Sequence, residues 1–115
     1  MKTSTIKPIS LISLLFGVAE SAVISKSRNT DSIYIRATLY YILKNFMEMG
    51  YVEIGREILI NHTTIIKALK NYNSDRFFSV LFKHFYDQDI FIDPKKVGGQ
   101  LKQRFLEYLN RPNII

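Results

Sequence analysis

The chain has 115 residues, the length of one ordinary domain, and its content of 47% hydrophobic and 13% aromatic residues is enough to bury a core. It has no cysteine, which excludes disulfides, thiolate zinc sites, cysteine nucleophiles and thiol redox chemistry, and fits a reducing cytoplasm. The net charge of +6 favours polyanionic partners, although charge alone does not separate nucleic-acid binding from a simply soluble surface.

The N-terminal segment has some features of a secretion signal. Lys2 and Lys7 precede an apolar stretch at residues 9–18, and residues 19–22 resemble a signal-peptidase site. Serines interrupt the apolar stretch, however, and cleavage would remove a helix that the domain needs. We therefore expect a cytoplasmic protein, and no stretch is long and apolar enough to predict a membrane span.

Helical periodicity runs through nearly the whole chain, and no alternating run is long enough to indicate a sheet, so the sequence predicts an all-α protein. The first predicted helix covers residues 8–17, with Pro8 in its first turn. Its apolar face consists of Ile9, Leu11, Ile12, Leu15 and Phe16.

A polar, basic segment at residues 25–30 follows a short turn of helix predicted at residues 20–24. We interpret this segment as an exposed basic loop, with Asn29 and Thr30 as candidate N-caps of the next helix. That helix is predicted over residues 31–49 and is the longest, with Gly50 as a left-handed C-terminal cap. Its aromatic residues stand at helical spacing in an apolar pattern, which indicates a place in the core.

Two short helices are predicted next, at residues 51–58 and 62–72, joined by a tight turn. Asn61 is the expected N-cap of the second helix, and Gly55 allows the two helices to approach closely. Ile65, Ile66 and Leu69 are expected to face inward. This arrangement is what a helix-turn-helix requires.

The remaining chain is predicted to form helices at residues 75–86 and 100–109, joined by residues 87–99. The cluster Phe77, Phe78, Phe82 and Phe85 is expected in a core or on a partner surface. We therefore expect a single helical DNA-binding domain with a core at residues 1–72 and a C-terminal helical extension at residues 73–115. A second copy of the chain, or another protein, is a candidate partner for this extension.

Three blocks of sequence, in order, resemble the C-terminal, double-stranded-DNA-binding domain of the bacterial replication initiator DnaA, a Trp-repressor-like helix-turn-helix. The most specific block is Ile54-Gly55-Arg56-Glu57-Ile58 followed by His62-Thr63-Thr64-Ile65-Ile66-Lys67-Ala68-Leu69. Upstream, Ser25-Lys26-Ser27-Arg28 is similar to the family's basic loop, and Arg36 with Tyr41 matches an Arg and a Tyr of its long helix. The resemblance covers residues 9–72.

The resemblance implies binding of duplex DNA, with the helix from His62 in the major groove. It implies that His62, Thr63 and Thr64 meet base edges, that Arg28 enters the adjacent minor groove, and that Lys44 lies near the phosphate backbone. These roles suit the side chains, because threonine offers a hydroxyl and a methyl for thymine, and arginine suits a narrow minor groove. The complete set of candidate DNA-binding residues is Lys26, Arg28, Arg36, Lys44, Asn61, His62, Thr63, Thr64 and Lys67.

The sequence departs from the family at the turn, where Ile60-Asn61 stands in place of a usual Arg-Asp. Asparagine keeps a base-edge hydrogen-bonding group without the negative charge, whereas the lost arginine removes a phosphate or guanine contact. The DNA site of the initiator is therefore not assumed. Asn29 and Thr30 also stand where further basic residues are common in the family.

No signature of catalysis, metal binding or a cofactor is present. There is no phosphate-binding Gly-x-x-x-x-Gly-Lys motif, and His62 and His84 lie in different predicted helices without a ligand cluster. The interpretation is a DNA-reading module that needs no small-molecule substrate and acts in replication or transcription. A phage or mobile element is one candidate source of such a module, and a cellular host is the other. The alternative is a helical interaction module that keeps the fold but has lost DNA binding.

Overall fold

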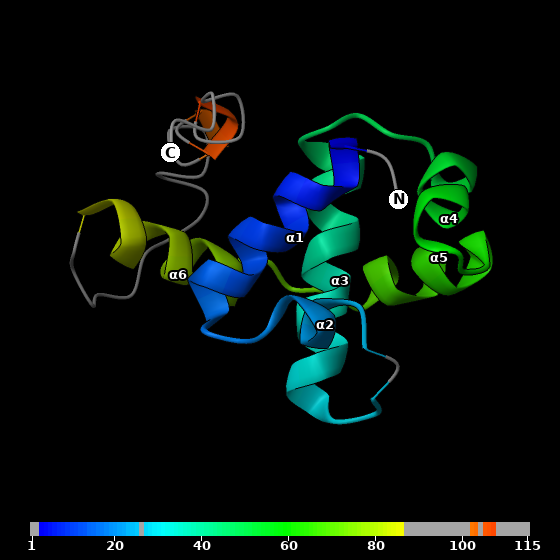
Figure 1. Cartoon of the computed structure of the whole chain (residues 1–115), viewed down its shortest axis with the longest axis horizontal. Coiled ribbons are helices and arrows are strands. Elements are labelled where there is room, and N and C mark those ends of the chain that lie inside the picture. The colour runs from blue at the N-terminus through cyan, green and yellow to red at the C-terminus, as the bar shows by residue number, and fades with distance from the viewer. Residues whose placement is uncertain (1–2, 26, 87–101, 104, 108–115) are drawn as a thin grey trace. The chain divides into compact units, whose positions relative to one another are not determined.

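The structure is a computed structural model that describes residues 3–25, 27–86, 102–103 and 105–107. The chain divides into two compact units, Met1–Tyr72 and Asn73–Ile115. All elements found in the described residues are helices, which confirms the all-α prediction. The first unit contains α1 (Thr3–Phe16), α2 (Glu20–Val23), α3 (Thr30–Asn45), α4 (Tyr51–Ile58) and α5 (His62–Lys70), and the second contains α6 (Asp75–Tyr86) (Figure 1).

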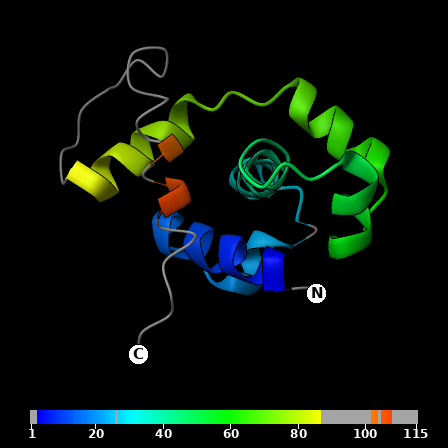
Figure 2. The same ribbon diagram turned by 90° about the horizontal axis from the view of Figure 1, so that it is seen from above.

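Helix α3 is the centre of the first unit. It contacts α1, α2, α4 and α5, and Figure 2, which looks along α3, shows α1 and α2 beside one flank and α4 and α5 beside another. Being covered from several sides, α3 buries residues around much of its circumference rather than on one narrow stripe. These buried residues are Ile35, Ala37, Thr38, Leu39, Tyr40, Ile42 and Leu43.

The two ends of α3 differ in how well the sequence predicted them. Asn29 is the N-cap, as expected, and its side-chain oxygen accepts a hydrogen bond from the backbone N–H of Asp31 at 2.9 Å. The C-terminal prediction was wrong, because α3 ends at Asn45 and Gly50, with φ −76°, is the N-cap of α4. The chain leaves the helix early because Phe46 and Met49 turn into the core, where each is buried.

Helix α1 begins earlier than predicted. It starts at Thr3, so Pro8 lies inside the helix and is not in its first turn. A proline there leaves one backbone carbonyl without its helical donor, and three buried side chains nearby, Ile9, Leu11 and Ile12, hold the segment against the core. Gly17, with φ +65°, ends the helix as expected.

Tyr72 lies outside α5, although the sequence placed it at the end of that helix. Its ring packs between Tyr34 and Tyr41, each with a centroid distance of 5.1 Å. Its hydroxyl lies 3.0 Å from the hydroxyl of Thr38, whose proton is donated to the Tyr34 carbonyl at 2.9 Å. Tyr72 is therefore the donor to Thr38, and this contact with α3 takes the chain out of the helix after Lys70.

The phenols of Tyr40, which is buried, and Tyr72, which is half-buried, make alkaline unfolding a test of this core. Burial raises the pKa of both Tyr72 and Tyr40. The unfolded state releases these protons from about pH 10 while the folded state keeps them, so stability is complete below pH 10 and falls above it. Each tyrosine adds a slope of about 1.4 kcal/mol per pH unit.

We expect Tyr72→Phe to lose about 1 kcal/mol at neutral pH, since the Thr38 hydroxyl loses a partner, and to show a shallower loss above pH 10. Urea unfolding from pH 7 to pH 11 measures both effects. Identical slopes for the variant and the wild type would contradict a raised pKa of Tyr72 in the folded state.

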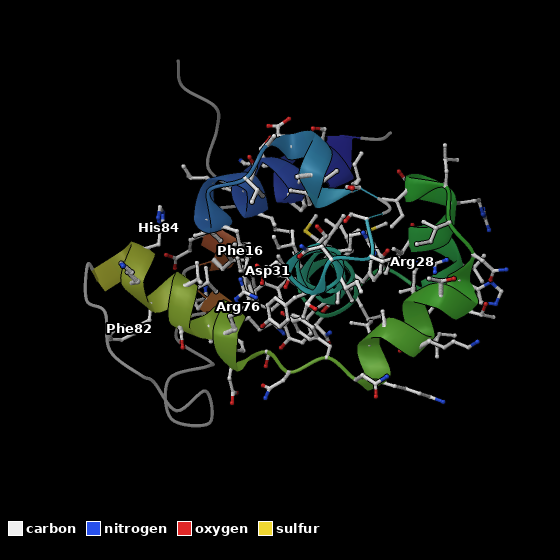
Figure 3. The ribbon with its side chains drawn as sticks, turned by 90° about the horizontal axis from the view of Figure 1, so that it is seen from below. Phe16, Arg28, Asp31, Arg76, Phe82 and His84 are labelled. Atoms are coloured by element: carbon white, nitrogen blue, oxygen red, sulfur yellow. The ribbon has the colours of Figure 1, made fainter. Side chains whose placement is uncertain are left out.

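The second unit is built around phenylalanines of α6, which has the predicted bounds. Asn73 caps it by accepting from the backbone N–H of Asp75 at 2.9 Å, and Phe77 packs edge-on against Phe105 at 5.7 Å. Phe77 and Phe78 are buried, whereas Phe82 is half-buried and His84 is exposed (Figure 3). Residues 102–103 and 105–107 are helical, inside the predicted range 100–109, and the predicted connection at residues 87–99 lies outside the described residues. No helix among the described residues is long and apolar enough to cross a membrane.

Candidate nucleic-acid interface

Helices α4 and α5 form a helix-turn-helix that depends on a glycine. A Cβ atom at Gly55 would lie 2.6 Å from the carbonyl oxygen of Ile60 and 3.4 Å from the backbone nitrogen of His62. Ile60 donates its N–H to the Gly55 carbonyl at 3.0 Å, which closes the turn. The close approach predicted for Gly55 is therefore confirmed, and its partner is the backbone of the turn itself. Ile54 and Ile65 are fully buried on either side of it.

The turn between the helices contains a leucine in the left-handed region. Leu59 has φ 60° and ψ 47°, and its side chain is 86% exposed. A non-glycine residue in this region costs about 1–2 kcal/mol, but a single such residue is enough to redirect the chain from α4 toward Asn61. No sequence signal indicated this conformation, because the pattern offers neither glycine nor asparagine at this position.

The first turn of α5 is capped by Asn61, as predicted. Its side-chain oxygen accepts from the backbone N–H of Thr63 at 2.9 Å and from the Thr63 hydroxyl at 2.8 Å. The Asn61 carbonyl accepts from the backbone N–H of Thr64 at 3.0 Å. The oxygen of Asn61 is thus occupied by the helix, so its amide N–H₂ is the group that can meet DNA.

The predicted base-reading residues share an exposed surface. Asn61, His62, Thr63 and Thr64 are all exposed, although Ile65 directly after them is fully buried. The hydroxyl of Thr63 donates to Asn61 but keeps its acceptor lone pairs and its methyl group. The first turn of α5 can therefore offer hydrogen-bonding groups and threonine methyls to a ligand outside the protein.

Loss of the Asn61 cap should be measurable. We expect Asn61→Ala to reduce the free energy of unfolding by about 1 kcal/mol, because the N–H of Thr63 loses its acceptor. Asn61→Asp is the matched control, since aspartate caps as well as asparagine. Urea unfolding of both variants checks this, and equal loss in both would show that the cap is not the cause.

Two similar hydrogen bonds, each from a backbone N–H to the hydroxyl of a serine two residues earlier, order the loop before α3. The Ser25 hydroxyl accepts from the Ser27 N–H at 3.1 Å, and the Ser27 hydroxyl accepts from the Asn29 N–H at 3.2 Å. Arg28, carried by this loop, is exposed. Figures 1 and 2 show the loop on the side of α3 where α4 and α5 lie, and Figure 3 labels Arg28 there. The basic loop and the helix-turn-helix therefore border the same side of the unit.

Arg36 holds this loop against α3. Its Nη1 donates to the carbonyl of Ser25 and, at 2.7 Å, to the carbonyl of Ser27. Arg36 is half-buried, so much of its side chain contacts the protein and is not accessible to a ligand. The sequence placed Arg36 among the DNA contacts, which stays a prediction, but the function visible in the structure is to position the segment that carries Arg28.

Two of the other three candidate cations lie in the described residues, at different places. Lys44, in the last turn of α3, has its ammonium 4.6 Å from the centre of the Tyr51 ring. Lys67 is exposed on α5. Lys26 lies outside the described residues. Arg28, Arg36 and the first turn of α5 thus lie on the side of α3 that faces α4 and α5. Lys44 is instead held by its cation–π contact with Tyr51.

The described residues contain no group of His, Asp or Glu side chains that could hold a metal ion.

A family model described as the bacterial DnaA protein helix-turn-helix matches residues 8–71, which run from α1 to the end of α5. No curated protein and no solved structure matches the chain. The matched residues all lie in the first unit, and the second unit is outside the match.

Proposed function

The chain belongs to the bacterial DnaA helix-turn-helix family, whose members bind DNA, and we propose on this premise that it reads a specific duplex sequence with α5 in the major groove. The observation that carries the proposal is the exposed first turn of α5, on the side of α3 that also carries the basic loop. A helix N-terminus approaches phosphates at low electrostatic cost, which suits this arrangement.

Each group has a separate role in the proposal. His62, Thr63 and Thr64 meet base edges, and the amide of Asn61 adds a donor beside them. Arg28 enters the neighbouring minor groove, where arginine is attracted by the negative potential. The remaining cations, Lys26, Lys44 and Lys67, contact phosphates and so contribute affinity but no sequence information.

The preferred DNA sequence differs from that of the initiator in this proposal. Ile60 is half-buried beside Gly55 and has no polar side-chain group, so it cannot replace the contact of an arginine at this turn. In this proposal the chain acts in the cytoplasm, in replication initiation or transcription control, and a phage or mobile element is one candidate source of its gene.

Fluorescence anisotropy with a random duplex and with an initiator-box duplex, each across a salt series, tests the proposal. We expect salt-dependent binding, weakened by about 1–2 kcal/mol in Arg28→Ala and in Thr64→Ala. Arg28→Ala should also make the dependence of affinity on salt shallower, because one cation leaves the strongly negative minor groove. Lys83→Ala is the charge-matched control, because Lys83 is exposed on α6, outside the family match.

Unchanged affinity in both Arg28→Ala and Thr64→Ala would overturn the groove-reading arrangement. Failure to bind either duplex at low salt would overturn DNA binding altogether. That second result favours the alternative function, a helical module that binds another protein.

A further inference from the structure

The first unit contains a hollow that the DNA-binding function does not use. Its volume is about 250 Å³, and it lies between the end of α2, the middle of α3 and the turn from α4 to α5. Its apolar wall includes Val23, Leu39, Ile58 and Ile60. An apolar cavity of about 150 Å³ is enough to bind benzene, so this hollow has room for a larger organic group.

The lining of the hollow is apolar except for Arg36, Tyr40 and Thr64, and of these three only Arg36 carries a charge. Arg36 donates to two neutral carbonyls, and no carboxylate in the described part of the chain pairs with it. The neighbouring hydroxyl of Tyr40 belongs to a side chain that is only 4% exposed, and burial raises its pKa, so it stays neutral. A half-buried guanidinium beside an apolar wall is suited to an anion with an apolar body, because the guanidinium fork binds carboxylates in a bidentate manner.

We propose that this hollow binds a small amphipathic carboxylate, with its apolar body against Leu39 and Ile60 and its carboxylate on Arg36, and that its occupation weakens DNA binding. The coupling follows from shared residues. Thr64 lines the hollow and also belongs to the exposed first turn of α5, and Arg36 holds the loop that carries Arg28. A carboxylate that competes for Arg36 loosens this loop and adds a negative charge close to the phosphates.

Ligand binding can be tested without DNA. A titration of ¹⁵N-labelled protein by NMR uses 4-phenylbutyrate as the probe and 4-phenylbutanol as its neutral counterpart. We expect a Kd of about 1 mM or lower for the carboxylate, which is modest for a ligand of this size, and binding at least about fivefold weaker for the alcohol. The amide signals of Val23, Ile24 and Thr64 should move, whereas that of Lys70, at the far end of α5, should not.

Two variants at adjacent positions distinguish the hollow from nonspecific binding. Ile60→Trp fills the hollow and should weaken the probe at least about tenfold, whereas Leu59→Trp places the same ring on the exposed neighbour outside it and should not. Ile24→Trp, at a wall residue that is 43% exposed, gives the same result if Ile60→Trp fails to fold. The proposed site would be overturned if 4-phenylbutyrate bound equally well to a folded Ile60→Trp or Ile24→Trp variant, or if the carboxylate and the alcohol bound the wild type equally well.

The coupling rests on the proposed function and is measured separately. Saturating 4-phenylbutyrate should weaken duplex binding of the wild type at least about fivefold, and by reciprocity duplex should weaken the probe by the same factor. In Ile60→Trp the duplex affinity should not respond to the probe. A wild-type affinity that does not change with the probe would overturn the coupling. If no duplex binds at all, the proposed function has failed while the NMR titration still decides the ligand site.

Discussion

Replacing Gly55 with alanine is expected to lower the free energy of unfolding by about 2–3 kcal/mol. The new Cβ would lie 2.6 Å from the carbonyl oxygen of Ile60, which is backbone and cannot move aside as a flexible side chain would. To make room, the turn must shift away from α4. The same shift lengthens the hydrogen bond from the Ile60 N–H to the Gly55 carbonyl, now 3.0 Å.

The sign of this effect is informative, because two contributions oppose each other. Gly55 lies inside α4, where alanine is favoured over glycine by about 1 kcal/mol when there is space. A destabilised variant therefore shows that the steric conflict exceeds this gain. Urea unfolding by circular dichroism measures the difference.

Gly50→Ala is the matched control for this substitution. Gly50 has an ordinary φ of −76°, and a Cβ there would meet nothing within 4 Å. We expect a change below about 0.5 kcal/mol, because two effects nearly cancel. Alanine lowers the conformational entropy of the unfolded chain, which stabilises the fold, and it caps the helix less well than glycine. If Gly55→Ala is as stable as Gly50→Ala, the close packing of the turn is not what holds α4 and α5 together.

Local side-chain chemistry explains which boundaries the sequence could predict. Asn29 and Asn61 each accept a hydrogen bond from a backbone N–H two residues later, so the starts of α3 and α5 are encoded within a few residues. The close approach at Gly55 could be predicted because residues 54–58 and 62–69 resemble the helix-turn-helix of the DnaA family. The same resemblance predicts an exposed first turn of α5.

The missed features depend on contacts that periodicity cannot reveal. The end of α3 is set by the burial of Phe46 and Met49, and the end of α5 is set by the packing of Tyr72 on residues far away in the sequence. Glycine at residue 50 suggested a helix end by composition alone, but the positive φ occurs at Glu48. Tertiary burial decided these boundaries against the local signals.

The structural function of Arg36 could not be predicted from the sequence. The sequence predicts that Arg36 contacts DNA, whereas in the structure it donates hydrogen bonds to Ser25 and Ser27, eleven and nine residues away. No local pattern encodes such a contact. The structure therefore adds a hypothesis that can be separated from direct DNA contact: Arg36 acts on DNA through the loop that carries Arg28.

We expect Arg36→Ala to weaken duplex binding by about 3 kcal/mol, more than Arg28→Ala, because the whole basic loop loses its attachment to α3. A double-mutant cycle measured by fluorescence anisotropy tests the mechanism. If Arg36 acts through the loop, adding Arg28→Ala to Arg36→Ala should cost almost nothing more, which gives a coupling energy of about 1–2 kcal/mol. Additive losses, within about 0.5 kcal/mol, would instead show that Arg36 contacts the DNA independently. A thermal unfolding curve of each variant confirms that the loss of affinity is measured on folded protein, since Arg36 lies on the edge of the core and its removal leaves the buried face of α3 intact.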